Sequence, residues 1–198
     1  MLGTIVNTVC IIAGSSVGAL LKRGIKEKYQ KVMFTAMGLA TLALGANTVC
    51  KHLPNSQYPV LFIVSLAVGG IIGTALDLDG RVNRFAEKNS SGKLAQGLTT
   101  ATLLYCIGTF SIVGPMLSAL QGDNTFLYTN STLDLVTSAI FAGTYGIGMI
   151  LAAPILFCWQ GGIYLLALTA GPVISDDLLT ELSVIGGALI TGSGLGIL

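Results

Sequence analysis

The chain has 198 residues, of which 53% are hydrophobic and only 10% are charged, and its mean hydropathy is +0.80. An average soluble protein carries about 25% charged residues. The composition therefore excludes a soluble globular domain, a disordered chain, a disulfide scaffold and a nucleic-acid binder. It predicts an all-α integral membrane protein whose main partner is the lipid bilayer.

A membrane crossing needs about 20 mostly apolar helical residues. Cutting the chain at its charged and polar stretches predicts a single transmembrane domain, residues 1–198, built as a bundle of about seven helices. The approximate spans are residues 1–21, 32–50, 59–76, 94–120, 135–158, 161–175 and 178–198. Residues 135–175 would extend for about 60 Å as one helix, so we expect two spans there, divided at residues 159–162 (WQGG).

The basic residues predict the orientation. All ten Lys and Arg lie at or before Lys93, five of them in residues 22–31 and four in residues 81–93. Basic loops remain in the cytoplasm, so residues 121–134 should lie outside. The sequence thus predicts a multi-pass protein of the bacterial cytoplasmic (inner) membrane with its N-terminus outside. Because its basic residues follow the apolar run, residues 1–21 should be a retained helix rather than a signal peptide.

Small residues at helical spacing predict close helix packing. Gly14 and Gly18 have the GxxxG spacing in the first span, and Gly69 and Gly73 have it in the third. Such faces let helix backbones approach one another, either within one chain or across a dimer. We expect a homodimer that uses the Gly69/Gly73 face.

No Asp, Glu, Lys or Arg lies deep in a predicted span, and Asp134 is expected to precede the fifth span as a helix cap. A proton relay of buried carboxylates and a cage for a multivalent cation are therefore not expected. Hydroxyl and amide side chains do occur inside spans, where unpaired polar groups are costly. They either bond helices together or line a polar path.

An internal repeat favours the second of these alternatives, a polar path lined by hydroxyl and amide side chains. Residues 10–18 (CIIAGSSVG) and 106–114 (CIGTFSIVG) match at five of nine positions, in spans predicted to run in opposite directions. This pattern suggests an inverted three-plus-three repeat, in which broken helices meet near the midplane and form the binding site. Gly114-Pro115 and Pro154 are the expected helix breaks. The expected path residues are Ser15, Ser16, Thr109 and Ser111, followed by Asn7, Asn47, Thr102, Thr144 and Gln160.

Enzymatic chemistry is not expected. Residues 14–18 (GSSVG) match the GxSxG string, but that motif needs a strand-to-helix turn and a histidine partner. The single histidine, His52, is predicted at the outer surface. The four cysteines form no CxxC pair, so no catalytic residue, metal site or cofactor is predicted.

Several segments together resemble the YqgA/YdfK-type family of bacterial inner-membrane proteins, which is grouped as a domain of unknown function. They are residues 3–7, 14–15, 105–114, 122–123, 134, 146–148, 160–161 and 181–187. The resemblance implies a location and an architecture, names no substrate, and points only loosely to biofilm-related phenotypes. It also implies one more basic turn and apolar segment after Leu198. Pro115 and Met116 depart from the family pattern.

Two functional hypotheses follow. The first is a small transporter or channel-like protein for a small solute or a monovalent ion, because uncharged oxygen atoms suit such ligands better than Zn²⁺ or a polyanion. The second is a membrane scaffold or interaction protein whose glycine faces serve oligomerisation.

Overall fold

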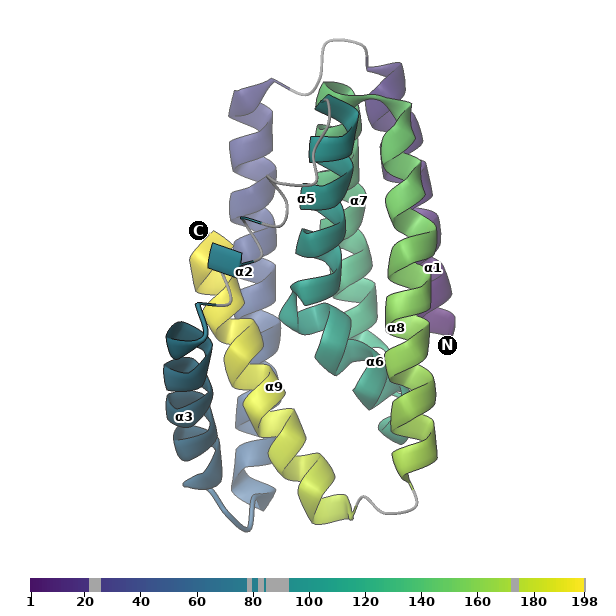
Figure 1. Cartoon of the computed structure of the whole chain (residues 1–198). Coiled ribbons are helices and arrows are strands. Elements are labelled where there is room, and N and C mark those ends of the chain that lie inside the picture. The colour runs from purple at the N-terminus through teal and green to yellow at the C-terminus, as the bar shows by residue number, and fades with distance from the viewer. Residues whose placement is uncertain (22–25, 78–79, 82–83, 85–92, 172–174, 198) are drawn as a thin grey trace. The chain divides into compact units, whose positions relative to one another are not determined.

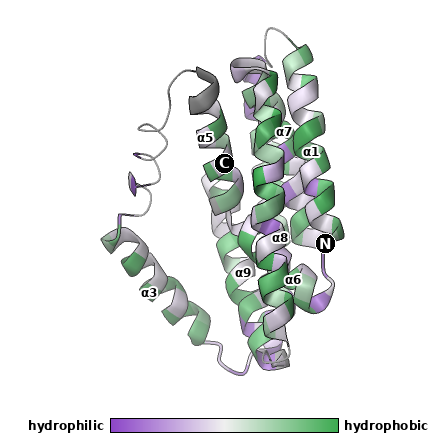
Figure 2. Cartoon of the chain, turned by 45° about the vertical axis from the view of Figure 1, so that its right-hand side comes forward, coloured by the Kyte–Doolittle hydropathy of each residue, from purple (hydrophilic) through white to green (hydrophobic). Residues whose placement is uncertain are grey.

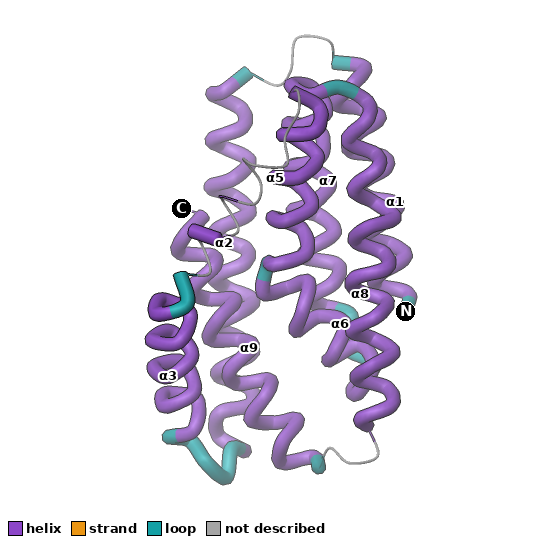
Figure 3. Tube along the Cα trace, in the orientation of Figure 1, coloured by secondary structure: helices purple, strands orange, loops and turns teal. Residues whose placement is uncertain are grey.

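The computed structural model describes residues 1–21, 26–77, 80–81, 84, 93–171 and 175–197. Within those ranges every regular element is helical and none is a strand (Figure 3). The predicted all-helical membrane class is confirmed. Parts of both basic loops, residues 22–25, 82–83 and 85–92, lie outside the described residues. So do residues 172–174 and 198, at the edges of the last two predicted spans.

The helices follow one another in the order shown by the colours of Figure 1. They are α1 (Leu2–Leu20), α2 (Glu27–His52), η1 (Leu53–Asn55), α3 (Leu61–Ala75), α5 (Lys93–Ile107), α6 (Thr109–Gln121), α7 (Thr125–Tyr145), η2 (Ile147–Leu151), α8 (Ala152–Ala170) and α9 (Asp176–Ile197).

The chain forms two compact units. Unit 1 comprises Met1–Phe34 and Ala86–Gly171, and unit 2 comprises Thr35–Phe85 and Pro172–Leu198. Unit 1 therefore contains α1, α5, α6, α7 and α8, whereas α3, α9 and most of α2 belong to unit 2. The units do not divide the chain into successive halves, as a simple three-plus-three repeat would.

The closest helix packing in unit 1 joins α1 to α7. A Cβ at Gly14 would overlap the carbonyl oxygen of Leu135, and one at Gly18 would overlap that of Ala139. Only glycine allows this approach, so the predicted small-residue face of α1 is used within the chain. Because residue numbers rise together along the contact, α1 and α7 run parallel.

Unit 2 has its own glycine contact, between α2 and α9. A Cβ at Gly45 would lie 2.5 Å from the backbone nitrogen of Thr191, and one at Gly194 would lie 2.6 Å from that of Leu42. These two helices run antiparallel, because the later residue of α2 meets the earlier residue of α9. None of the residues of α3 is buried, and α3 contacts α9.

The predicted count of seven spans is not confirmed. Among the described residues four helices are long and apolar enough to cross a membrane, and there are five if the bent pair α5 and α6 forms one span. Helix α3 has only 15 residues, which reach about 22 Å at ~1.5 Å per residue. Helix α7 has 21 residues but is too polar to qualify by hydropathy.

The helix breaks differ from those expected. The fourth span breaks at Gly108, where α5 and α6 meet at 44°, while Pro115 lies inside α6. The division of residues 135–175 falls at Gly146, whose φ of 94° suits glycine, rather than at residues 159–162, which lie within α8. Pro154 occupies the first turn of α8, where proline is tolerated.

The proposed repeat is also not confirmed. Residues 10–18 lie in the uninterrupted helix α1, whereas residues 106–114 cross the break at Gly108. The matched segments therefore differ in local conformation.

Candidate functional site

A buried carboxylate lies in the middle of α7. Asp134 was expected to precede a helix, but α7 begins at Thr125 and includes it. Its Oδ2 accepts hydrogen bonds from Nδ2 of Asn7 on α1, at 2.9 Å, and from Nδ2 of Asn130 on α7, at 2.8 Å. The expectation that Asp134 precedes its helix as a cap is therefore wrong.

Two more helices contribute to the same network. Oγ of Ser111 on α6 accepts hydrogen bonds from Nδ2 of Asn130, at 3.3 Å, and from Nε2 of Gln160 on α8, at 3.2 Å. Five side chains from α1, α6, α7 and α8 are thus connected. We call them the polar cluster: Asn7, Ser111, Asn130, Asp134 and Gln160. In Figure 2, hydrophilic ribbon interrupts the hydrophobic stretches of α1 and α7.

The polar cluster is closed to solvent and has spare hydrogen-bonding capacity. Asn7, Ser111 and Gln160 are fully buried, and Asn130 and Asp134 are at most 6% exposed. Oδ1 of Asn7 and Oε1 of Gln160 are buried without a hydrogen-bond partner. Buried polar atoms are usually satisfied in native proteins. The unpartnered atoms are both amide oxygens, so the cluster has unused acceptors beside a carboxylate.

An apolar layer borders the cluster on one side. Ile11 follows Asn7 by one turn of α1, and Leu156 precedes Gln160 by one turn of α8; both are fully buried. They pack in one core with Tyr105, Met149 and small residues of α5, α7 and α8. Tyr105 and Ser138 form a 2.8 Å hydrogen bond beside this core.

Polar groups continue on the other side, toward the start of α1. Oδ1 of Asn124 accepts hydrogen bonds from the backbone N–H of Gly3, at 3.3 Å, and from Oγ of Ser118, at 2.8 Å. Ser118 follows Ser111 by seven residues, or two turns, along α6. The polar cluster therefore lies between a polar end of unit 1 and an apolar layer.

The structure brings three of the nine predicted path residues together: Asn7, Ser111 and Gln160. Ser15 is fully buried on α1 and its Oγ has no partner. Ser16 and Thr144 donate hydrogen bonds to carbonyl groups of their own helices. Asn47 is exposed and belongs to unit 2, while Thr102 and Thr109 are partly buried.

Sequence reasoning missed Asn130 and Asp134. Their spacing of four residues places them on one face of a helix, and Phe126 and Leu127 precede them on an apolar face that is buried. This periodicity was the signal that α7 extends back to Thr125.

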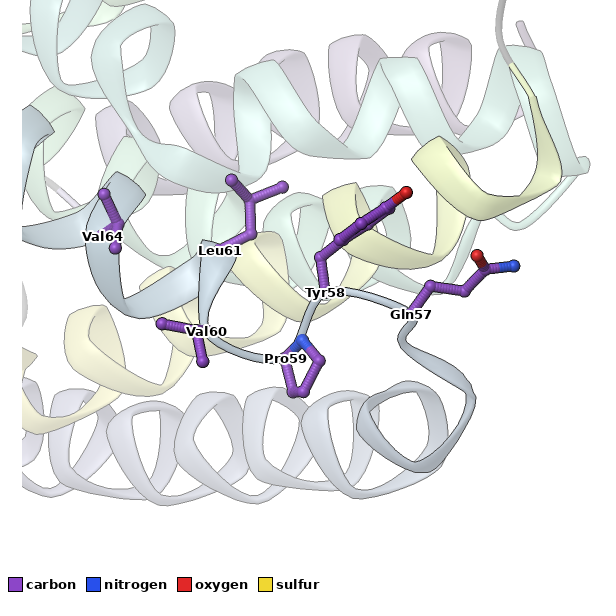
Figure 4. A pocket seen from close by; sticks show the side chains of 6 residues that line it. All are labelled: Gln57, Tyr58, Pro59, Val60, Leu61 and Val64. Atoms are coloured by element: carbon purple, nitrogen blue, oxygen red, sulfur yellow. The ribbon is translucent and has the colours of Figure 1, made fainter.

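Unit 2 contains a second buried acid. Oε1 of Glu181 on α9 accepts hydrogen bonds from Oγ of Ser56, at 2.7 Å, and from the backbone N–H of Tyr58, at 3.0 Å. The carboxylate thus holds the segment between η1 and α3. Tyr58 also lines an open, mainly apolar pocket of about 620 Å³ with Gln57, Pro59, Val60, Leu61 and Val64 (Figure 4). No charged side chain lines this pocket, so it is a weaker candidate site.

The described ranges contain no group of three His, Cys, Asp or Glu side chains placed to hold a metal ion. The GxSxG string lies inside helix α1, without the strand-to-helix turn that a nucleophile requires.

Comparisons with known proteins agree with these membrane features. A profile of the family described as "Protein of unknown function (DUF554)" matches residues 2–198. The chain is 52% identical over 198 residues to the "Uncharacterized membrane protein YdfK" of Bacillus subtilis (strain 168), covering 100% of this chain and 86% of that protein. It is 28% identical over 216 residues to the "Uncharacterized protein YqgA" of Escherichia coli (strain K12), covering 100% and 87%. No solved structure matches. Because the profile spans nearly the whole chain, this chain is a membrane protein that belongs to the DUF554 family.

Proposed function

We propose that this protein is a small transporter or channel-like protein for a small solute or a monovalent ion. The observation that carries the proposal is the polar cluster, which joins four helices around Asp134 and leaves two amide oxygens unpartnered. Polar and ionisable groups inside membrane segments are costly and typically mark substrate or ion pathways. The proposal involves no catalytic step and no cofactor.

The surroundings of the polar cluster support a gated path. Asn124 and Ser118 form a second polar contact on the side toward the start of α1, and an apolar layer lies on the opposite side of the cluster. The helix break at Gly108 lies one turn before Ser111. Broken helices beside a buried polar site are a recurring feature of transporters.

We further propose that the protein lies in the bacterial cytoplasmic membrane with its N-terminus outside. The positions of the basic residues support this orientation, and α1 and α7 run parallel, as it requires. Asn124 would then lie on the outer side of the polar cluster.

Reconstituted flux measurements test the transport proposal. Proteoliposomes would be assayed for uptake of radiolabelled Na⁺ and Rb⁺, and for osmotic entry of glycerol and urea. We expect at least one probe to enter faster than into protein-free liposomes. Ser15→Ala should alter this rate while hardly changing the melting temperature, since Ser15 Oγ has no hydrogen bond to lose. Entry at the protein-free rate for all four probes would contradict the proposal.

A second candidate is a membrane scaffold that self-associates through α3. No residue of α3 is buried, and a Cβ at Gly69 or Gly70 would meet no atom within 4 Å. This face is therefore open to another copy of the chain or to lipid.

A further inference from the structure

We propose that the polar cluster is a binding site for a monovalent cation, with Asp134 as the charged ligand and Na⁺ and H⁺ as competing occupants. This inference rests on the proposed function, because it names the ligand class of the same site. It differs from the sequence-based expectation, which relied on uncharged oxygen atoms alone.

The charge balance around Asp134 is the first argument. Within the part of the chain that the structure describes, no Lys, Arg or His forms an ion pair with this carboxylate. The groups in electrostatic contact with it are Cys10, Tyr105 and Cys106, and none of them is cationic. Helix α6 has no titratable side chain; on α8, Cys158 is exposed and Tyr164 is partly buried. A buried carboxylate without a counter-ion is costly, and a bound proton or metal cation removes that cost.

The unpartnered atoms are the second argument. Oδ1 of Asn7 and Oε1 of Gln160 are buried acceptors on side chains that belong to the Asp134 network. A bound cation would give such oxygens a partner, whereas an anion would be repelled by them. Pro115 has no N–H to donate to the carbonyl of Ser111, four residues earlier, so this carbonyl lacks its usual helical donor.

The number of charges selects a monovalent ion. Hard cations prefer oxygen ligands, and Ca²⁺ sites usually combine several carboxylates. The polar cluster has one carboxylate, which balances one positive charge. Glu181 belongs to the other unit and already binds the segment before α3.

The first test measures binding by thermal unfolding of the full chain in detergent. We expect the melting temperature to rise and saturate as Na⁺ replaces choline at constant ionic strength, and the half-saturating Na⁺ concentration to increase as pH falls. Asp134→Asn should weaken apparent Na⁺ affinity by at least about tenfold. The matched control Asp123→Asn, at an exposed position, should keep the wild-type response. An unchanged wild-type melting temperature, or an unchanged response in Asp134→Asn, would overturn the proposal.

A second test uses the wild-type chain and so does not depend on the folding of a variant. Dicyclohexylcarbodiimide reacts with protonated carboxyl groups in apolar surroundings, and mass spectrometry locates the adduct. We expect an adduct on Asp134 in choline that decreases at least about tenfold in saturating Na⁺. Equal labelling in both salts, or an equal decrease at Asp134 and Glu181, would contradict a specific site.

These tests separate the two proposals. Na⁺ protection of Asp134 in a protein that moves none of the flux probes keeps the cation site and refutes transport. Flux without Na⁺ protection keeps transport and refutes the cation site.

Discussion

Asn7 on α1 donates a 2.9 Å hydrogen bond from Nδ2 to Oδ2 of Asp134 on α7, although the two residues are 127 positions apart in the chain. The bond lies on the same contact where Gly14 and Gly18 bring the two helix backbones together. Close backbone packing and a buried polar contact therefore occur on one helix pair.

Replacing Asn7 with Ala should reveal the strength of this hydrogen bond. A hydrogen bond to a charged group contributes about 1.5–3 kcal/mol, whereas interhelical bonds in membrane proteins average about 0.6 kcal/mol. Asn7 is fully buried and its acceptor is a carboxylate. We therefore expect Asn7→Ala to lower the free energy of unfolding by an amount within the higher of these two ranges.

The matched control for Asn7 is the neighbouring residue. Thr8 donates only to the carbonyl of Thr4 on its own helix. Thr8→Ala should therefore lower the free energy of unfolding by less than Asn7→Ala does. Reversible unfolding in mixed micelles measures both variants. Equal losses of unfolding free energy in the two variants would show that the hydrogen bond to Asp134 is no stronger than the bond within α1.

Replacing Gly14 with Ala should push α1 away from α7. The added Cβ would overlap the carbonyl oxygen of Leu135, and overpacking typically costs about 1–3 kcal/mol. Gly162→Ala on α8 is the control, because a Cβ there meets nothing within 4 Å. We expect its melting temperature to stay level or rise slightly, as alanine favours a helix over glycine. A stable Gly14→Ala variant would contradict the described helix contact.

The proposed orientation predicts which loops react on intact cells. In a cysteine-free background, Asp123→Cys should react with an impermeant thiol reagent, whereas Lys26→Cys should react only after the cells are opened. Asp123 is preferred to Gly122, whose φ of 71° disfavours a side chain. The opposite labelling pattern would invert the orientation.

Self-association through α3 can be tested at Gly69. Nothing lies within 4 Å of a Cβ at this position, so Gly69→Leu should leave the monomer folded. If α3 forms the dimer face, native mass spectrometry should show a dimer for the wild type and a monomer for this variant. Gly162→Leu should remain dimeric. A monomeric wild type in both mild detergent and lipid would contradict self-association.

The sequence predicts the membrane class because the amino-acid composition of the whole chain reflects whether its surface faces water or lipid. It also identifies Asn7, Ser111 and Gln160, since amides and hydroxyls inside apolar helices are conspicuous. Asp134 was not predicted as a site residue because a charged residue usually marks the end of a membrane span. Helix α7 instead buries its acidic residue within the helix. Helix α7 begins at Thr125, whose N–H donates a 2.8 Å hydrogen bond to Oδ1 of Asp123.

The other helix ends required tertiary information. Residues 159–162 resemble a polar turn, yet Gln160 points into the polar cluster and the chain around it stays helical. The break at Gly146 depends on a backbone conformation with positive φ, which glycine permits at many positions without requiring it.

The proposed path requires the polar cluster to be reached from one face of the membrane and closed from the other. Cysteine accessibility at Ser111 tests it most directly, with Ala152, fully buried in the apolar layer, as the control. In a cysteine-free background, Ser111→Cys should react with a small cationic thiol reagent added outside, and Na⁺ should slow the reaction. Ala152→Cys should stay unmodified. If Ser111→Cys is as inert as Ala152→Cys in a folded protein, the polar cluster is only a structural hydrogen-bond network.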